Sequence, residues 1–484
     1  MPIIELLSRF IPNPAGALWL GAIVSAVVFA DRDRVLSPRN LALGALLSPG
    51  VFLAHIVTYR LDAAPRAAPL LYSGVYLATA GMAVWGFALA RNVGNREPWR
   101  PNLPPAVLRA MVLVLLALDT VVTIGRRPDD AGIYSGLGAA RWFETGRLPY
   151  SDPLLKGAEA PGYGAAATYG PLLYASQLPF QAVTGSVRNP AEAVPKDRGG
   201  EYRWPPELAT KLASLAFFLL GAWALFLAAR GMAGTDTALG VLVLWLSSPY
   251  VIGLGGDKFE ITGLGFISHI APSATMMLAV AGFSSAALSG ALFAASAGVL
   301  FFPAFLFPAW FAWRAKLRDG SWRPFLLGFG AAALALVALV VWFTPPLDGK
   351  GPIRLFLEST LEHQEGMSAR EYGASQDSFW GTHPGAAAFW QHPLIAGTSL
   401  FKPTFLLFAA AALGSVAWVR GRSVAQLAAI TAALGAAIQL WKTHATGSYV
   451  EWYLPFLLLA LICGNGVGRA ATGDEAPTAG SGRA

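Results

Sequence analysis

Residues 290–313 read GALFAASAGVLFFPAFLFPAWFAW, an apolar stretch long enough to cross a membrane that carries two prolines, Pro303 and Pro308. A proline inside a helix removes a hydrogen bond and kinks or breaks the helix. We therefore expect two short helices, about 286–301 and 303–313, that meet near Phe302–Pro303. Because the number of crossings decides which loops share a side of the membrane, this break determines the topology of the chain.

The composition indicates a membrane protein. The 484-residue chain is 55% hydrophobic and 13% charged, whereas soluble domains carry about a quarter charged residues. Apolar runs of spanning length recur along it, which predicts an all-α polytopic fold. The expected spans, besides the broken one, lie near 16–30, 41–59, 70–90, 106–125, 207–229, 237–254, 266–283, 324–344, 400–419, 424–441 and 448–465.

The charge balance points to lipid rather than nucleic acid. The formal charge of +7 is expected of a polytopic protein whose cytoplasmic loops face anionic lipids. The single cysteine, Cys463, excludes an intrachain disulfide and a cysteine-based metal cluster. The N-terminal segment lacks a basic region and a clean cleavage site, so no cleaved signal peptide is expected.

Four short basic loops set the expected orientation: 31–40, 91–100, 313–323 and 419–423. The positive-inside rule places all four in the cytoplasm only if residues 286–313 cross the membrane twice. The result is about 13 crossings, with the N-terminus outside and the C-terminus inside. The large loops 126–206 and 345–399 then lie outside the cytoplasm. We thus expect a multi-pass protein of the plasma (inner) membrane whose polar chemistry is extracytoplasmic.

Three regions are expected along the chain. Residues 1–105 form an N-terminal extension of three membrane helices, and residues 106–465 form the membrane core with the two large loops. The small and polar residues 466–484 are typical of a disordered tail, cytoplasmic in this topology. The segment 169–185 is apolar but interrupted by prolines, which favours a re-entrant or interfacial element.

The densest polar chemistry follows the fourth expected span. The stretch RRPDDAGIYSGLGAARWFETGRLPYSD (126–152) holds the adjacent acids Asp129 and Asp130. A carboxylate at the water–membrane boundary suits a general base for an acceptor hydroxyl, and two adjacent carboxylates raise the pKa of one of them. Alternatively the pair caps a helix over 131–144, since Asp is a favoured N-cap residue. Both roles can coexist.

These motifs resemble those of polytopic glycosyltransferases of the GT-C superfamily, and within it the polyprenyl-phosphate-mannose-dependent glycosyltransferase family 87. The matching positions are Asp130 four residues before Tyr134, Tyr150 at the end of GRLPY, and Tyr169 in Tyr-Gly-Pro-Leu. HIAPSATMMLAVAGF, LFFPAFLFPAW and SYVEWYLPFLLLAL resemble later family segments, so the resemblance covers about 106–465. Pro272 and Phe301 stand where the family usually has an acid and a lysine.

The resemblance implies a membrane glycosyltransferase of the cell envelope. It would move mannose, or another hexose or pentose, with inversion from a polyprenyl-phosphate donor to a hydroxyl of a glycan or glycolipid acceptor. Asp130 would be the general base and Asp129 its partner, while Tyr134, Tyr150 and Tyr169 would contact the substrates. The lipid-linked sugar is a substrate, and no cofactor is implied.

A lipid phosphate needs cations and hydrogen-bond donors near the membrane surface. The candidates for holding it are Lys258, His269, Lys402 and His444. Each could instead be a snorkelling anchor at a helix end. Glu451, next to Trp452, is the candidate for contact with the acceptor or with a cation, because an unpaired acid at the end of a membrane helix is costly. The spacing of Glu362, His363 and His383 matches no metal-ligand motif, so no metal site is expected.

Two other functions fit part of the pattern. A polymerase or ligase of envelope polysaccharide usually keeps arginines in a late outer loop, whereas the 345–399 loop is acidic. A transporter or flippase of lipid-linked substrates predicts ionisable residues at membrane depth, for which Asp119 is the main candidate. We detect no internal repeat of the kind that many transporters have.

Overall fold

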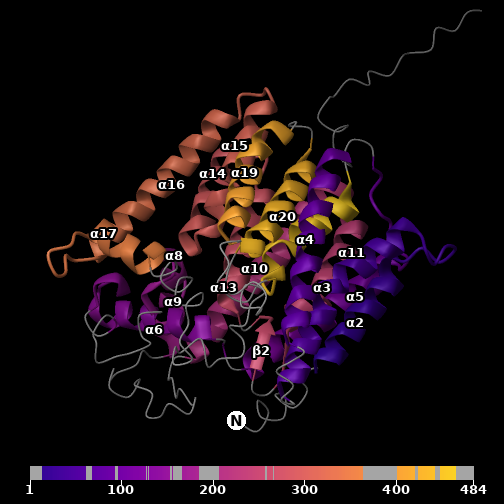
Figure 1. The fold of residues 1–484 in the computed structure, drawn as a ribbon, viewed down its shortest axis with the longest axis horizontal. Helices are drawn as coiled ribbons and strands as arrows, with labels where there is room; N and C mark the ends of the chain where they lie inside the picture. Colours follow the sequence, from indigo (N-terminus) through magenta and orange to yellow (C-terminus); the bar gives the residue numbers. More distant parts are fainter. Residues whose placement is uncertain are drawn as a thin grey trace, which may run out of the picture.

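The computed structural model describes residues 13–61, 68–92, 96–126, 128, 130–152, 155, 166–184, 207–256, 259–264, 266–362, 401–419, 423–441 and 447–464. Within these ranges the chain is helical apart from one short two-stranded hairpin and its connecting segments. Figure 1 shows the helices packed side by side, with α16 tilted relative to most of the others. The helical, membrane-type architecture expected from composition is therefore confirmed.

Six helices of the described part are long and apolar enough to cross a membrane. They are Pro38–Thr58, Leu71–Asn92, Pro105–Gly125, Leu208–Ala233, Trp322–Phe343 and Val424–Trp441. Several shorter apolar helices accompany them: Pro14–Phe29, Thr235–Leu246, Ile267–Ala281, Ala286–Val299, Pro403–Trp418 and Leu454–Cys463.

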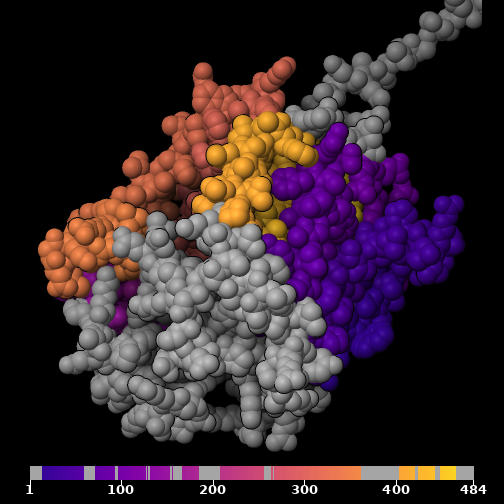
Figure 2. Space-filling model, viewed as in Figure 1, coloured from indigo at the N-terminus to yellow at the C-terminus, as the bar shows by residue number. Residues whose placement is uncertain are grey.

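The three N-terminal helices are α2 (Pro14–Phe29), α3 (Pro38–Leu61) and α4 (Ala68–Asn92). α4 packs against α20 (Val424–Trp441) so closely that a Cβ atom on Gly86 would lie 2.9 Å from the backbone nitrogen of Ala433. Figure 2 shows α4 adjoining α19 (Phe401–Trp418) on the same face, where the Tyr76 hydroxyl bonds to Thr404. The expected extension is thus packed directly onto the later helices.

A tyrosine fastens α3 to the core. Pro49 lies inside α3 and cannot donate to the preceding turn. One residue later, the hydroxyl of Tyr250 accepts a hydrogen bond from Gly50 N at 2.8 Å and donates one to the Leu46 carbonyl at 2.9 Å. An inserted side chain of this kind is a recognised cause of helix kinks. The hydroxyl therefore bridges two groups that a regular helix would join directly.

The helix break expected from the prolines is present. α14 (Ala286–Val299) ends where Leu300 turns extended, a 3-10 turn follows as η5 (Phe302–Leu306), and α15 (Phe307–Lys316) continues from it. The guanidinium of Arg314 donates to the Phe283 carbonyl at 2.7 Å, so the end of α15 lies beside the start of α14. The two helices form a hairpin, and the prediction of two short helices is confirmed.

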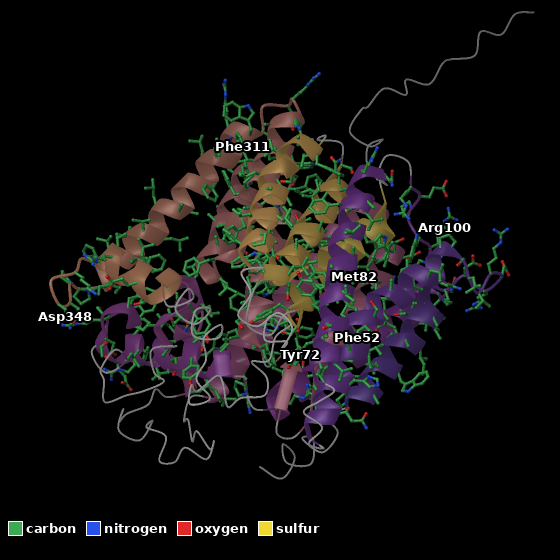
Figure 3. All side chains as sticks on the ribbon, viewed as in Figure 1. Phe52, Tyr72, Met82, Arg100, Phe311 and Asp348 are labelled. Carbon is green, nitrogen blue, oxygen red and sulfur yellow. The ribbon has the colours of Figure 1, made fainter. Side chains whose placement is uncertain are left out.

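Hydrogen bonds gather the basic residues at one end of the bundle. Arg39 donates to the Arg100 carbonyl at 2.8 Å, and Trp99 N donates to the Ile462 carbonyl at 2.9 Å. Lys316 donates to the Val419 carbonyl at 2.6 Å. Trp313 donates to the Ser423 carbonyl at 3.1 Å and Gln426 to the Ala90 carbonyl at 3.1 Å, so the end of α15 lies near the end of α4. We call this the basic end. Figure 3 shows Arg100 and Asp348 on opposite sides of the molecule.

The first large loop folds into short helices. After α5 (Pro105–Gly125) come α6 (Asp130–Thr145), η2 (Pro149–Ser151), α8 (Pro171–Ala175) and α9 (Leu178–Thr184). α6 coincides with the helix expected over 131–144. The segment expected to be re-entrant or interfacial is helical as α8 and α9, both packed against α6. They lead to α10 (Glu207–Ala233).

The segment expected to span at 237–254 is not one continuous helix. α11 (Thr235–Leu246) ends early, α12 (Pro249–Ile252) is a single turn, and the antiparallel strands β1 (Leu254–Gly256) and β2 (Phe259–Thr262) follow. Pro249 starts a new helix instead of continuing α11, and Gly253 has φ of 110°, a conformation that favours glycine. This small hairpin is a local exception within the helical fold of the described residues.

The remaining elements complete the bundle. α13 (Ile267–Ala281) follows the hairpin, and α16 (Trp322–Phe343) packs mainly along α14. The second large loop begins with α17 (Pro352–Leu357) and a π-helical turn, η6 (Glu358–Glu362). Near the C-terminal end lie η8 (Val450–Trp452), α21 (Leu454–Leu458) and the π-helical η9 (Leu459–Cys463). Residues 363–400 and the tail expected from 466 lie outside the described residues.

Candidate functional site

The acid pair stands at the start of α6. Asp130 is the first residue of the helix, which makes Asp129 the residue before it. Asp129 and the side chain of Asp130 lie outside the described residues. The position of α6 therefore agrees with the capping interpretation and leaves the catalytic one as a prediction.

Two glycines allow α6 to pack closely against its neighbours. A Cβ atom on Gly136 would lie 2.5 Å from the Thr210 hydroxyl oxygen on α10. One on Gly138 would lie 2.6 Å from the Ala166 carbonyl oxygen. The Gln177 amide links this interface, donating to Ser135 at 3.1 Å and accepting from Thr210 at 3.0 Å. The GLG sequence in this loop thus fixes the helix that starts at the acid pair.

Of the three expected substrate tyrosines, Tyr134 and Tyr150 are buried in the fold of the first loop and Tyr169 is half-buried there. Tyr134 is 5% exposed and packs with Leu137 beside Tyr169. The Tyr150 hydroxyl donates to the Tyr169 carbonyl at 2.7 Å, and Tyr174 accepts from Tyr169 N at 3.0 Å. Burial raises the pKa of Tyr150 and of Tyr174. Their neutral hydroxyls stabilise the loop, and contact with a substrate remains a prediction.

An ion pair closes the turn after α6. Arg141 Nε donates to Asp152 Oδ2 at 2.6 Å, and Arg141 also pairs with Glu144 at 3.4 Å. Burial raises the pKa of the Glu144 carboxyl, and the Arg141 charge opposes that shift. The GRLPYSD segment is therefore held by charge at one end and by the Tyr150 hydroxyl in the middle.

His269 and Glu451 meet in the interior. His269 Nδ1 lies 3.4 Å from Glu451 Oε2, and the two residues are 3% and 1% exposed. The other carboxylate oxygen of Glu451 accepts from Gly263 N at 3.0 Å. This contact is an ion pair when His269 is protonated. The structure thus brings together two residues that were separate candidates in the sequence.

Aromatic rings enclose this pair. The His269 ring lies 4.1 Å from the Tyr449 ring and 4.7 Å from the Phe266 ring, measured between centroids. Trp452 stacks on Phe302 at 3.8 Å, directly at the helix break, and its indole nitrogen donates to the Ser268 carbonyl at 3.3 Å. Trp452 thereby joins the break to α13. It is 3% exposed.

A small cavity adjoins Glu451. Its volume is about 10 Å³, and it is lined by Gly221, Trp245, Ile270, Ser273, Ala274, Met277, Glu451 and Pro455. A space of this size holds about one water molecule. It is too small for a sugar, so a bound sugar would need a different space or a rearranged one.

Two short segments, residues 251–252 and 263–264, connect the end of α5 to the His269–Glu451 contact through their backbone groups. Arg126, the residue after α5, donates from Nη1 to the Ile252 carbonyl at 2.8 Å. The next segment is tied in by Leu264 N, which donates to the Val251 carbonyl at 3.1 Å, and by the Ser214 hydroxyl, which donates to the Leu264 carbonyl. Residues 251–252 and 263–264 therefore lie between α5, α10 and Glu451.

The sequence analysis gave no role to two cations, Arg126 and Lys211, that lie near the end of α5. Arg126 is 7% exposed, and the Lys211 ammonium donates to the Ile124 carbonyl at the end of α5 at 3.1 Å. Lys211 could have been found as an isolated charge at the start of an apolar helix. Arg126 stood beside the acid pair but carried no separate signal.

Several predicted residues cannot be located. Lys258 and His444 lie outside the described residues, as does the side chain of Lys402. His363 and His383 also fall outside them. In the part of the chain that is described, no group of three or more His, Cys, Asp or Glu residues is arranged to hold a metal. Comparison with protein-family models, curated proteins and solved structures found no match for this chain.

Proposed function

We propose that this protein is an inverting membrane glycosyltransferase. It moves a sugar, mannose or another hexose or pentose, from a polyprenyl-phosphate donor to an extracytoplasmic hydroxyl of a glycan or glycolipid. One observation carries the proposal: α6, which begins at Asp130, packs against α13, and α13 carries the buried His269 that faces Glu451. A helix that starts with a candidate base is thereby joined to the helix that carries a candidate phosphate ligand.

The chemistry requires a base and a charge acceptor. As the acceptor oxygen bonds to the anomeric carbon, the bond from that carbon to the phosphate oxygen breaks. Asp130 takes the acceptor proton, and Asp129 tunes or orients it. The departing lipid phosphate gains one negative charge, which a protonated His269 would stabilise. Glu451, in contact with His269, keeps that imidazole in position.

We further propose that the chain crosses the membrane about 13 times, with the basic end in the cytoplasm. Two findings support this topology. The α14–α15 hairpin is compatible with two crossings by this segment, as the basic loops require. The side-chain bonds of Arg39, Arg314 and Lys316 bring loops far apart in sequence to one end. The acid pair would then face outward.

A transporter or flippase of lipid-linked substrates is the second candidate. It is favoured by Asp119, which lies inside α5 and is 0% exposed. An ionisable residue at such depth is a common feature of transport proteins. The two functions differ in outcome, since a transporter moves the lipid-linked sugar intact, whereas a transferase leaves sugar on the acceptor.

The decisive experiment supplies membranes with radiolabelled polyprenyl-phosphate mannose and measures label on acceptor glycans or glycolipids. Wild-type protein should transfer label, and Asp130→Asn should reduce the rate by about 10²-fold or more. Asn caps helices about as well as Asp, so folding should survive. Asp129→Asn should cost less. The exposed Asp236→Asn, at the start of α11, is the control and should be unchanged.

Two outcomes would contradict the proposal. If neither Asp130→Asn nor Asp129→Asn altered transfer, the pair would act only as a helix cap. If labelled lipid crossed the membrane intact with no label on any acceptor, the transporter interpretation would replace the transferase.

A further inference from the structure

α17 follows a membrane-length helix and turns back beside it. α16 ends at Phe343, and an Asp-Gly turn comes next, in which Asp348 has φ of 51° and Gly349 has φ of 72°. Such a pair is typical of a tight two-residue reversal of the backbone. Leu347 and Lys350 close the turn with two backbone hydrogen bonds, of 3.2 and 2.9 Å. α17 therefore packs against α16, at the end of that helix far from α15 (Figure 1).

The side chains of α17 divide among three faces. Leu355 is buried against the first large loop and α16. Arg354 bonds to Glu358 at 2.8 Å, and these two residues form a charged face. Ile353 and Leu357 lie four residues apart, and thus on one face of the helix, and each is 40% exposed. This short helix therefore has a buried face, a charged face and an exposed apolar face.

Trp342 marks the level at which α16 leaves the membrane. It is the last residue but one of the helix and is 83% exposed. Tryptophan is enriched where membrane helices meet the lipid headgroups, because its ring is apolar and its N–H is polar. Only 11% of the apolar window of α16 is buried inside the protein, against 33% or more for the other five membrane-length helices among the described residues. Lipid therefore surrounds most of α16, and α17 lies where that lipid ends.

Charge does not account for the exposed apolar face. Lys350 and Arg354 both bond to Glu358, at 2.7 and 2.8 Å. Together with Asp348 in the turn, residues 348–358 carry two positive and two negative charges. Attraction to anionic lipids requires an excess of cations, which this segment does not have. Burial of the apolar side chains is the remaining force that could hold the helix on a membrane.

We propose that α17 docks onto the lipid bilayer, with Ile353 and Leu357 inserted at the boundary between headgroups and acyl chains and with Trp342 at the same level. The helix then lies in the plane of the interface, with its charged face toward headgroups and water and its buried face on the protein. All three faces of α17 are satisfied by this arrangement. The docking depends neither on which side of the membrane is cytoplasmic nor on glycosyl transfer.

A docked α17 would fix the depth of the first large loop. α17 packs on η2, where the Tyr150 ring lies 5.1 Å from the Phe356 ring. η2 belongs to the segment that follows α6, the helix that begins at Asp130. Only this consequence rests on the proposed function: a loop held at headgroup level lies where the phosphate of a lipid-linked donor is found.

The docking can be tested on the full chain in lipid nanodiscs, with a fluorophore on single introduced cysteines. Ile353→Cys and Leu357→Cys report on the apolar face. Arg354→Cys is the matched control, because its position is on the same helix but 71% exposed on the charged face. The native Cys463 is buried and should stay unlabelled. Lipids brominated near the headgroup end of their acyl chains should quench the two apolar-face labels, whereas aqueous iodide should quench the Arg354→Cys label.

Three outcomes would overturn the proposal. Equal quenching by iodide at all three positions, with none by brominated lipid, would place the apolar face in water. Shielding from both quenchers, with energy transfer between labels on two copies, would mean that a second chain covers the face. Quenching by brominated lipid only when anionic lipids are present would mean that charge, and not apolar burial, holds the helix on the membrane.

A substitution on the exposed face separates docking from folding. Ile353→Glu places a charge at the lipid boundary, which is costly. A Leu357→Cys label in the same chain should then lose its quenching by brominated lipid and gain access to iodide. Ile353→Val stays apolar and should change neither signal. Both variants should remain folded, because Ile353 does not belong to the buried face of α17. Unchanged quenching in Ile353→Glu would overturn the proposal.

Transfer of labelled mannose tests the consequence for the first loop. Ile353→Glu should lower the rate of transfer from the polyprenyl donor relative to wild type. Normal transfer in a chain whose α17 has left the membrane would contradict the link between docking and the depth of the loop. If wild-type protein transferred no label, the proposed function would fail, and the quenching experiment would still decide whether α17 docks. The two failures can therefore be told apart.

Discussion

Gly170 donates its backbone N–H to the carbonyl oxygen of Val299 at 3.2 Å, which joins the first large loop to the last residue of α14. A Cβ atom on Gly170 would collide with the Gly298 carbonyl oxygen. The Tyr-Gly-Pro-Leu segment therefore meets the helix break at a point where only glycine fits. Because Trp452 stacks on Phe302 just beyond the break, this contact connects the first loop with the region around His269.

Gly170→Ala should destabilise the protein by about 1–3 kcal/mol, the usual cost of overpacking. The opposing atoms belong to backbone and cannot rotate away. Thermal unfolding in detergent measures the loss. Gly330→Ala on α16 is the matched control, because a Cβ atom there meets nothing within 4 Å. Alanine favours helix there, so the control should be neutral or more stable. Equal behaviour of the two variants would contradict the close contact at Gly170.

Tyr250→Phe should loosen the attachment of α3. The change leaves Gly50 N–H and the Leu46 carbonyl without the bridging hydroxyl, and each buried unsatisfied group costs about 1–3 kcal/mol. Hydrogen exchange should increase around residues 46–50 more than in α20. Tyr72→Phe, on the neighbouring α4 and also buried, serves for comparison. Unchanged exchange at Gly50 in Tyr250→Phe would show that the helix closes its own bond there.

Glu451→Gln should impair transfer more than stability. The glutamine oxygen can still accept from Gly263 N, but the charge facing His269 is lost. A double-mutant cycle with His269→Gln should give an interaction energy of about 0.5–3 kcal/mol in the transfer rate. Strict additivity of the two variants would mean that the residues act independently despite the 3.4 Å contact.

The stability of the protein against unfolding at acidic pH should depend on Glu358. Hydrogen bonds from Lys350 and Arg354 lower the pKa of its carboxyl below the usual 4.5. A lowered folded-state pKa gives stability that is present above about pH 4.5 and is lost as the pH falls through the folded value. Glu358→Gln should remove this pH dependence, seen as a flatter melting temperature below pH 4.5. The effect should be small because the side chains of Lys350 and Arg354 are partly exposed. Identical profiles for variant and wild type would contradict it.

Local patterns predicted the elements well where a single residue type decides the backbone. Pro303 predicted the break between α14 and α15, and the acid pair, as candidate N-cap residues, indicated the helix that is α6. The hairpin after Gly253 was missed, because an apolar run with glycines fits a span as well as a strand. Local hydropathy cannot distinguish a membrane span from a strand unless the backbone conformation at a proline or a glycine is known.

The site was predicted as separate residues rather than as a geometry. His269 and Glu451 each stood out as ionisable groups near helix ends, but their contact depends on how α13 and η8 pack. The same holds for Trp452, whose place beside Phe302 follows from the helix break and not from its own neighbours in sequence. Lys211 and Arg126 meet the end of α5 through long-range bonds to Ile124 and Ile252. No spacing along the chain encodes such contacts.

The proposed sidedness can be tested with single cysteines. Glu159→Cys lies in the first large loop, and Asp319→Cys lies in the exposed turn after α15, beside Arg318. The native Cys463 is buried and should not interfere. In intact cells an impermeant thiol reagent should label Glu159→Cys and leave Asp319→Cys unlabelled, and permeabilised cells should label both. The positive-inside rule supplies the physical reason, because Arg314, Lys316 and Arg318 hold that turn on the cytoplasmic side. The reverse labelling would place the acid pair in the cytoplasm and would remove the basis for an extracytoplasmic lipid-linked donor.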